Sequence, residues 1–268
     1  MMEVLQFEFM QNALMAGLLA SLICGIIGSL VVVNRIVFIS GGIAHASYGG
    51  VGLAFFLGLP VLPVTTAFTV LAALIMAAVT LRARERADTV IGVIWAAGMA
   101  LGIILLDVTP GYNVDLMSYL FGSILAVPRS DLWIMAGLAG FVFLVVIAFY
   151  RGFLVMSFDE EFARSRGVPV NFLYFLLISM VGLSVVMVIR VVGLILVIAL
   201  LTIPPFIAEQ HTKSLDRMMI VSTLLSAAFT VSGLALSFIA DITSGASIIA
   251  VASTCFFLSF LLPGKKRG

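Results

Sequence analysis

Residues 39–55 read ISGGIAHASYGGVGLAF and place one of the chain's two histidines inside an apolar, glycine-rich segment. A neutral imidazole offers one lone pair and is a good ligand for a borderline transition-metal ion. On a helix, the spacing of Gly41, His45 and Gly49 puts all three on one face. Small residues let a neighbouring helix or a substrate approach closely. The small residues singled out for a pathway or for packing are Gly41, Gly42, Gly49 and Gly50. A histidine that is hydrogen-bonded across a helix interface is the alternative interpretation.

The composition of the chain shows where this segment lies. The 268 residues are 63% hydrophobic and 10% charged, whereas soluble domains are about a quarter charged. Apolar runs of about 20 residues, long enough to cross a membrane as helices, recur along the whole chain. The alternating short segments of a membrane barrel are not found. We therefore predict an all-α, polytopic transmembrane bundle that forms one integral-membrane domain over residues 1–268, in the cell membrane.

Nine segments are predicted to span the membrane, with eight or ten as alternatives. They are residues 9–33, 36–58, 61–81, 89–108, 131–150, 170–189, 191–209, 217–239 and 246–262. The stretch SYLFGSILAV, residues 118–127, is too short to cross alone. It is predicted to be a half-helix or a re-entrant piece at the membrane edge.

Basic residues predict the orientation. Twelve of the 14 lysines and arginines fall in one set of loops, and only Arg129 and Arg190 lie on the other side. The basic side is expected to be cytoplasmic, which places the N-terminus outside and the C-terminus inside. The outer side then carries six carboxylates, and Asp241 is a candidate for the outer entrance. These acids either attract cations to a pathway or simply cap and solvate loops.

The orientation also predicts the depth of His45. The second span begins just after Arg35, and ten residues of helix rise about 15 Å, half of the hydrocarbon layer. An ionisable side chain at that depth usually faces a bundle interior or a polar cavity. His45 is therefore a candidate metal ligand.

The chain lacks the motifs of an ATP hydrolase or a membrane protease. No G-x-x-x-x-G-K-[ST] phosphate loop and no H-E-x-x-H motif occurs in the sequence. These absences exclude ATP hydrolysis by the phosphate-loop route. We expect a protein that is not an enzyme and that needs no cofactor.

The stretch SFDEEFARSRGVPV, residues 157–170, carries a set of helix start and stop signals. Ser157 as N-cap with Glu160 predicts a capping box, and Gly167 predicts the end of the helix. Glu160 with Arg164, and Phe158 with Phe162, are spaced as i, i+4 pairs. A helix this short is marginal in water by itself. It needs a docking surface, which is the membrane, its own bundle or a partner.

Two further features lie near the inner boundary of the seventh span. Pro204 and Pro205 are predicted to break that helix and to free carbonyls that could line a gate, or else to kink it for packing. Glu209 supplies an oxygen donor if it is buried, and is otherwise an ordinary water-exposed carboxylate.

The chain resembles the permease subunits of ATP-binding-cassette importers for zinc, manganese and iron. The resemblance rests on five blocks in order: GGIAHASYGGVGLA, SYLFGSILAV, SFDEEFARSRGVPV, VVGLILVIALLTIPPFIAEQ and DITSGASIIAV. It implies a homodimer around a central pathway, two cytoplasmic ATPases and an extracytoplasmic protein that delivers the metal. It also implies that the helix near 158–166 is the coupling helix that docks on the ATPase. The coupling residues are then Phe158, Asp159, Glu160, Glu161, Phe162, Arg164 and Gly167.

One position departs from the pattern of this family. Many members carry an aspartate one turn before the histidine, where this chain has Gly41. A lone histidine slightly favours zinc over manganese, or a transient site that the dimer mate or another helix completes. The expected function is a permease for a divalent transition-metal ion, zinc or manganese. The alternatives are a permease for a metal chelate, or a secondary transporter or channel that needs no ATPase.

Overall fold

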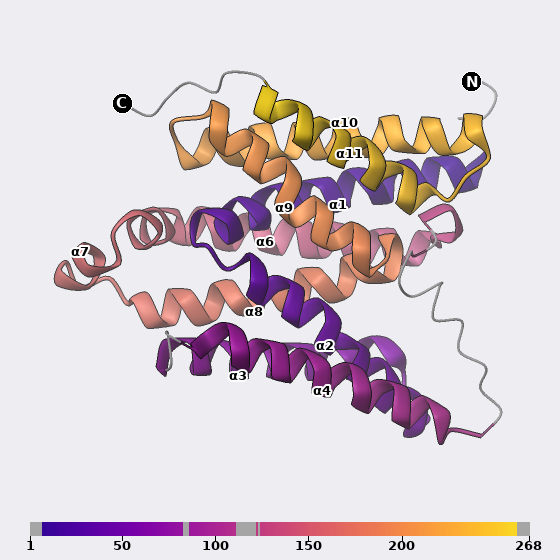
Figure 1. The fold of residues 1–268 in the computed structure, drawn as a ribbon, viewed down its shortest axis with the longest axis horizontal. Helices are drawn as coiled ribbons and strands as arrows, with labels where there is room; N and C mark the ends of the chain where they lie inside the picture. The colour runs from indigo at the N-terminus through magenta and orange to yellow at the C-terminus, as the bar shows by residue number, and fades with distance from the viewer. Residues whose placement is uncertain (1–6, 83–85, 111–121, 123, 262–268) are drawn as a thin grey trace. The chain divides into compact units, whose positions relative to one another are not determined.

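The computed structural model of the protein describes residues 7–82, 86–110, 122 and 124–261. Within those residues it contains ten α-helices, one 3-10 helix and no strand, which confirms the all-α prediction (Figure 1). The elements are α1 Glu8–Val33, α2 Val37–Phe56, α3 Val61–Arg82, α4 Ala87–Asp107, η3 Ile124–Ala126, α6 Arg129–Phe158, α7 Glu160–Ser165, α8 Val170–Val192, α9 Leu194–His211, α10 Leu215–Ala240 and α11 Ser244–Leu261.

Nine of these helices match the nine predicted spans one for one. Eight are long and apolar enough to cross a membrane. The ninth is α2, whose 20 residues include five glycines, two serines and His45, so that its hydropathy is lower. The multi-pass membrane fold is thus confirmed.

The helix of the fifth predicted span, 131–150, extends beyond residue 150. Helix α6 continues to Phe158. Phe153 and Met156 are buried, and a Cβ on Gly152 would lie 2.8 Å from a methyl group of Leu173 in α8. Burial of these apolar groups favours continuing the helix beyond the charged Arg151.

The described residues form two compact units. The first unit holds α1, residues 129–150 of α6, residues 188–192 of α8, and α9 to α11. In it, α1 packs against α9 and α10, and α11 packs against the same two helices. The second unit holds α2, α3, α4, the end of α6, α7 and most of α8, with α2 packed against both α3 and α4. The prediction of one domain over residues 1–268 stays a prediction.

A single glycine joins α8 to α9. Gly193 has a φ of 85°, a conformation that favours glycine because it has no Cβ. Its N–H donates to the carbonyl of Ile189 at 2.8 Å, and its own carbonyl accepts from the N–H of Val197 at 3.2 Å. A Cβ on Gly122, which has a φ of 65°, would collide with the backbone of Gly193. Both positions therefore require glycine.

Half of the predicted re-entrant piece at 118–127 lies outside the described residues, which include only 122 and 124–127 of it. Its described end contains the 3-10 helix η3 with Ile124 buried. Asn12 of α1 donates to the carbonyl of Val127 at 3.2 Å, so this end is anchored on α1.

Candidate functional site

His45 lies in the middle of α2 and is half-buried. Its Nδ1 atom is buried and has no hydrogen-bond partner among the described residues. A buried polar atom without a partner costs about 1–3 kcal/mol. Such an atom needs an explanation, and a contact with water, an ion or another ligand is one. The alternative of a histidine hydrogen-bonded across an interface has no such bond at Nδ1 in the part of the chain that the structure describes.

Trp95 of α4 covers one face of the His45 ring. The two ring centroids are 4.1 Å apart and the planes meet at 14°, which is a stacked arrangement. The indole N–H of Trp95 donates to the sulfur of Met99 at 3.1 Å, one turn further along α4. Phe38 of α2 lies 6.1 Å from the Trp95 ring at a tilt of 53°. The sequence analysis missed Trp95 and Met99. Their i, i+4 spacing is a signal for mutual contact, but nothing local indicates contact with His45.

Glycines bring the backbones of α2 and α4 together beside this stack. A Cβ on Gly49 would lie 2.8 Å from the carbonyl oxygen of Gly98, and one on Gly98 would lie 2.9 Å from the Cα of Ala46. A Cβ on Gly52 would lie closer still to the backbone of Gly102, and one on Gly102 closer still to the backbone of Tyr48. The contact between α2 and α4 therefore depends on the absence of side chains.

The four small residues singled out on α2 differ in their surroundings. A Cβ on Gly42 would lie 2.6 Å from Cγ2 of Ile91, and one on Gly50 would lie 2.9 Å from the Cα of Thr65 in α3. With Gly49, these two glycines serve helix packing. Gly41 is different, because a Cβ there would meet nothing within 4 Å. There is thus room for a side chain at position 41, where many members of the family that the chain resembles carry an aspartate.

The described residues of one chain do not gather a full set of metal ligands around His45. No group of three or more His, Cys, Asp or Glu that could hold a metal ion is found among them. Glu209 is half-buried in α9, a helix of the other unit, so its role as an oxygen donor stays a prediction. Cys24 and Cys255 are both free thiols.

The predicted break at Pro204 and Pro205 is wrong. Helix α9 runs without interruption from Leu194 to His211 and contains both prolines, which are buried. Proline at 205 removes the N–H that would bond the carbonyl of Leu201. That carbonyl faces Gly28 of α1, where a Cβ would lie 2.6 Å from its oxygen and 2.8 Å from Cγ of Pro205. The close approach of α1 therefore covers this carbonyl, which does not line an open gate.

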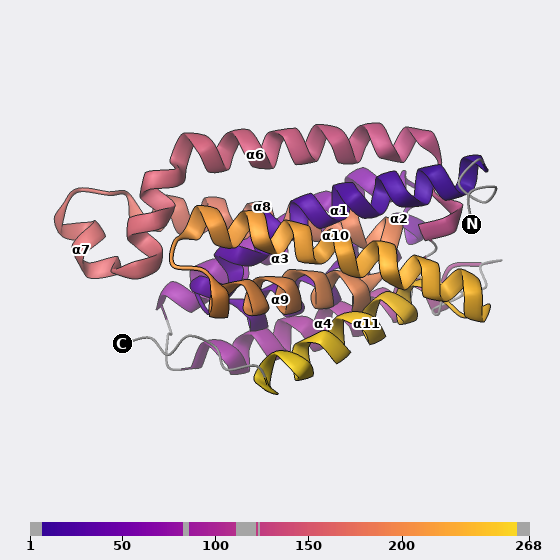
Figure 2. The same ribbon diagram turned by 90° about the horizontal axis from the view of Figure 1, so that it is seen from above.

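The loop helix α7 is shorter than predicted and begins at a different cap. Ser157 belongs to α6, and the N-cap of α7 is Asp159, whose carboxylate accepts from the N–H of Phe162 at 2.8 Å. The predicted capping box of Ser157 with Glu160 is therefore wrong, because α6 continues through Ser157. Phe158 ends α6, so it does not share a helix with Phe162. Figure 2 shows α7 between the end of α6 and the start of α8.

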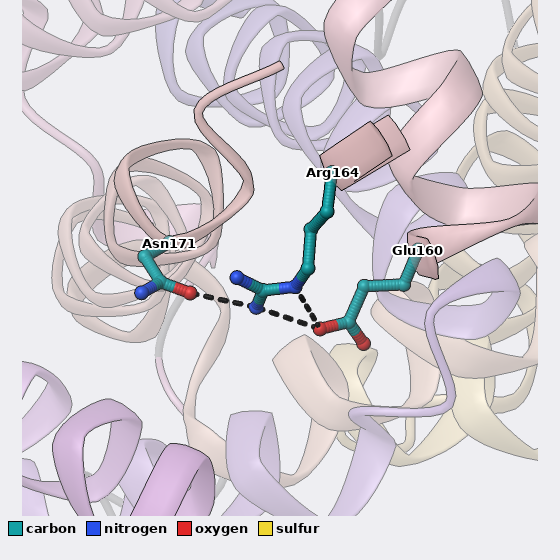
Figure 3. A network of polar contacts seen from close by, with 3 residues as sticks. All are labelled: Glu160, Arg164 and Asn171. Carbon is teal, nitrogen blue, oxygen red and sulfur yellow. Dashed lines mark hydrogen bonds and ion pairs between the residues drawn. The ribbon is translucent and has the colours of Figure 1, made fainter. Parts of the chain in front are cut away.

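The end of α7 is fixed as predicted. Gly167 has a φ of 76°, and its N–H bonds the carbonyl of Arg164 while that of Val168 bonds the carbonyl of Ala163, both at 3.0 Å. This pair of bonds is a Schellman motif. Arg164 also donates to Glu160 at 2.8 Å and to Asn171 of α8 at 2.7 Å, as Figure 3 shows. Six residues are thereby held in one conformation by contacts at both ends.

The surface of α7 combines charge with exposed aromatic rings. Phe158 is 65% exposed and Phe162 is 48% exposed. The guanidinium of Arg166 lies 5.2 Å from the centre of the Phe162 ring, a cation–π contact. One exposed ring at the end of α6 and one on α7 give this turn of the chain apolar surface that a partner can cover.

The two arginines assigned to the outer side are both paired. Arg129 bonds Glu8 at 2.8 Å, and Arg190 bonds Asp131 at 3.2 Å. These pairs neutralise two of the carboxylates counted on that side. Asp241 is exposed and caps α10 in the left-handed conformation, with a φ of 52°. Its assignment to an outer entrance stays a prediction.

The fold is that of a polytopic helical membrane protein, with eight described helices long and apolar enough to cross a membrane. The family described as the ABC 3 transport family matches residues 6–263. The chain therefore belongs to that family, which confirms the resemblance to ATP-binding-cassette permeases.

Several individual proteins are similar over nearly the whole chain. An uncharacterized membrane protein of Synechocystis sp. is 50% identical over 259 residues, covering 97% of this chain and 92% of that protein. The manganese transport system membrane protein MntC of Halalkalibacterium halodurans is 35% identical over 264 residues, covering 98% and 90%. The structure of PsaBC from Streptococcus pneumoniae in complex with Fab matches with a TM-score of 0.89 at 33% identity, covering 99% of this chain and 96% of that one.

Proposed function

We propose that the chain is the permease of an ATP-binding-cassette importer that carries a divalent transition-metal ion, manganese or zinc, into the cytoplasm. The observation that carries this proposal is His45, an imidazole in an apolar helix with a buried Nδ1 that lacks a partner among the described residues. Relatives that are 34% and 35% identical are named as manganese transport proteins. The imidazole suits zinc. Manganese favours a carboxylate, and the chain has none at position 41, where the residue is glycine.

The metal path requires more than one chain. One chain offers no cluster of three ligands among its described residues, and a single imidazole does not complete a metal shell. A homodimer with its pathway on the twofold axis brings two copies of His45 together. Water, Glu209 or a helix of the partner copy supplies the remaining donors. A weak, transient site suits a conduit, because a deep energy well would trap the ion.

Helix α7 couples ATP hydrolysis to transport. A separate cytoplasmic ATPase binds this helix, because the helix is fixed at both ends and exposes Phe162, while Phe158 is exposed just before it at the end of α6. An extracytoplasmic binding protein delivers the metal to the other side, near Asp241. The basic side of the membrane is then cytoplasmic, as the distribution of lysine and arginine predicts.

The test is metal uptake by the reconstituted complex of permease, ATPase and binding protein. Uptake of manganese and zinc should fall in His45→Ala at matched protein levels, whereas His211→Ala, a change to the chain's other histidine, should behave as wild type. His211 is exposed and its Nδ1 contacts the carbonyl of Ile207 at 3.0 Å. Undiminished uptake of both ions by His45→Ala would refute the proposal.

A further inference from the structure

We infer that Trp95 and Met99 act as positioning residues that fix the plane of the His45 ring and so set the direction in which its nitrogens meet the transported ion. The inference rests on the proposed function of His45. It adds two residues of α4 to a site that is otherwise built on α2.

The stack restricts the rotation of the imidazole. The rings are nearly parallel, at 14°, with centroids 4.1 Å apart. Turning the imidazole about its Cβ–Cγ bond would drive one edge into the indole. Aromatic pairs of this kind are stabilised beyond the area that they bury. A ring held in this way meets an ion without first losing rotational freedom.

The indole is itself held in place. Its N–H donates to the sulfur of Met99 at 3.1 Å, which fixes the rotation of Trp95 on its own helix. Gly98 lies between these two residues in sequence and contacts Ala46, the residue that follows His45. The spacing between the helices is therefore set one residue away from the stack. Any group that separated α2 from α4 at this point would also separate the two rings.

The arrangement resembles the outer shell of a metal site, in which a partner fixes the orientation of a ligating histidine. Loss of such a partner typically weakens metal affinity by about 10–100-fold. Here the partner is an aromatic face, since Nδ1 of His45 has no hydrogen bond to another described residue. The support acts on the plane of the ring and does not use Nδ1 in a hydrogen bond to another described residue.

The experiment measures manganese and zinc binding to the purified complex by equilibrium dialysis. Trp95→Leu, which removes the stack, should weaken binding by about tenfold or more. Met99→Leu, which removes only the sulfur acceptor, should weaken it less. Trp95→Phe keeps a ring without the N–H and should lie between them, so it preserves the test if Trp95→Leu does not fold. Trp133→Leu, at a tryptophan that is 79% exposed on α6, is the control and should bind as wild type.

A spectroscopic signature separates positioning from a general effect on folding. In Trp133→Phe the indole of Trp95 is the chain's one remaining tryptophan. Manganese should change its fluorescence, and His45→Ala should abolish that change. Wild-type affinity in both Trp95 variants, with binding lost in His45→Ala, overturns the positioning role and leaves the proposed function intact. Wild-type affinity in His45→Ala overturns the site itself.

Discussion

Asp131 and Arg190 form an ion pair, with Nε 3.2 Å from Oδ2, that ties the first turn of α6 to the last turn of α8. The aspartate side chain is only 11% exposed, whereas the arginine side chain is 49% exposed. Removing the arginine therefore leaves a mostly buried carboxylate, whereas removing the aspartate leaves a half-exposed guanidinium.

Replacing Arg190 with methionine should lower the stability of the permease more than replacing Asp131 with asparagine. The first change leaves a buried carboxylate without its cation, at a cost of about 1–3 kcal/mol. The second leaves a half-exposed arginine that water can solvate. Thermal unfolding of the detergent-purified variants measures the difference. The double variant should recover part of the loss, and equal destabilisation by both single changes would contradict this asymmetry.

Gly41→Asp should shift the metal preference toward manganese. A Cβ at this position meets nothing within 4 Å, so the carboxylate fits one turn before His45 and adds the oxygen donor that manganese favours. Gly41→Asn has nearly the same shape without the charge and is the matched control. Competitive uptake of the two ions by the reconstituted complex measures the ratio. A ratio unchanged from wild type in Gly41→Asp would show that position 41 does not face the ion.

Asp159→Ala should reduce ATP-driven uptake while the permease remains in the membrane. Asp159 accepts from the N–H of Phe162, and loss of such a cap costs about 1 kcal/mol, which is large for a helix of six residues. Asp159→Asn keeps a capping oxygen and should retain most of the activity. Pull-down of the ATPase, compared at equal amounts of permease, should follow the same order. Full uptake by Asp159→Ala would separate α7 from energy coupling.

Cysteine labelling tests the orientation. In a variant with Cys24 and Cys255 replaced by alanine, a cysteine at Asp241 should react with an impermeant thiol reagent on intact cells. A cysteine at Glu161 should react only after the cells are opened. Both residues are exposed in the structure. The reverse pattern would place the basic loops outside.

Sequence predicted the helices well where apolar length decides the outcome and less well where tertiary packing does. The end of α6 was missed because Arg151 reads as a membrane boundary, yet burial of Phe153 and Met156 continues the helix. The N-cap of α7 was also missed. Ser157 and Asp159 are both good capping residues, and Asp159 takes the position because α6 extends through Ser157.

The candidate site likewise has one residue that the sequence predicted and one that it did not. His45 could be found from the chain alone, because an ionisable side chain in an apolar span is costly. Its neighbour Trp95 lies 50 residues later on another helix. Their contact depends on how Gly98 lets α4 approach α2, and no local pattern carries that information.

The close contact between α2 and α4 also limits how this protein can evolve. A Cβ on Gly52, Gly98 or Gly102 would lie within 3 Å of backbone atoms of the facing helix, which cannot turn aside as a side chain can. Glycine is the smallest coded residue, so every missense change in these three codons adds a group that has no room. A saturation library should lose nearly all variants at these codons and keep many at Gly41 and Gly92, where a Cβ meets nothing within 4 Å. Evolution can therefore alter specificity at Gly41 while the three facing glycines stay fixed.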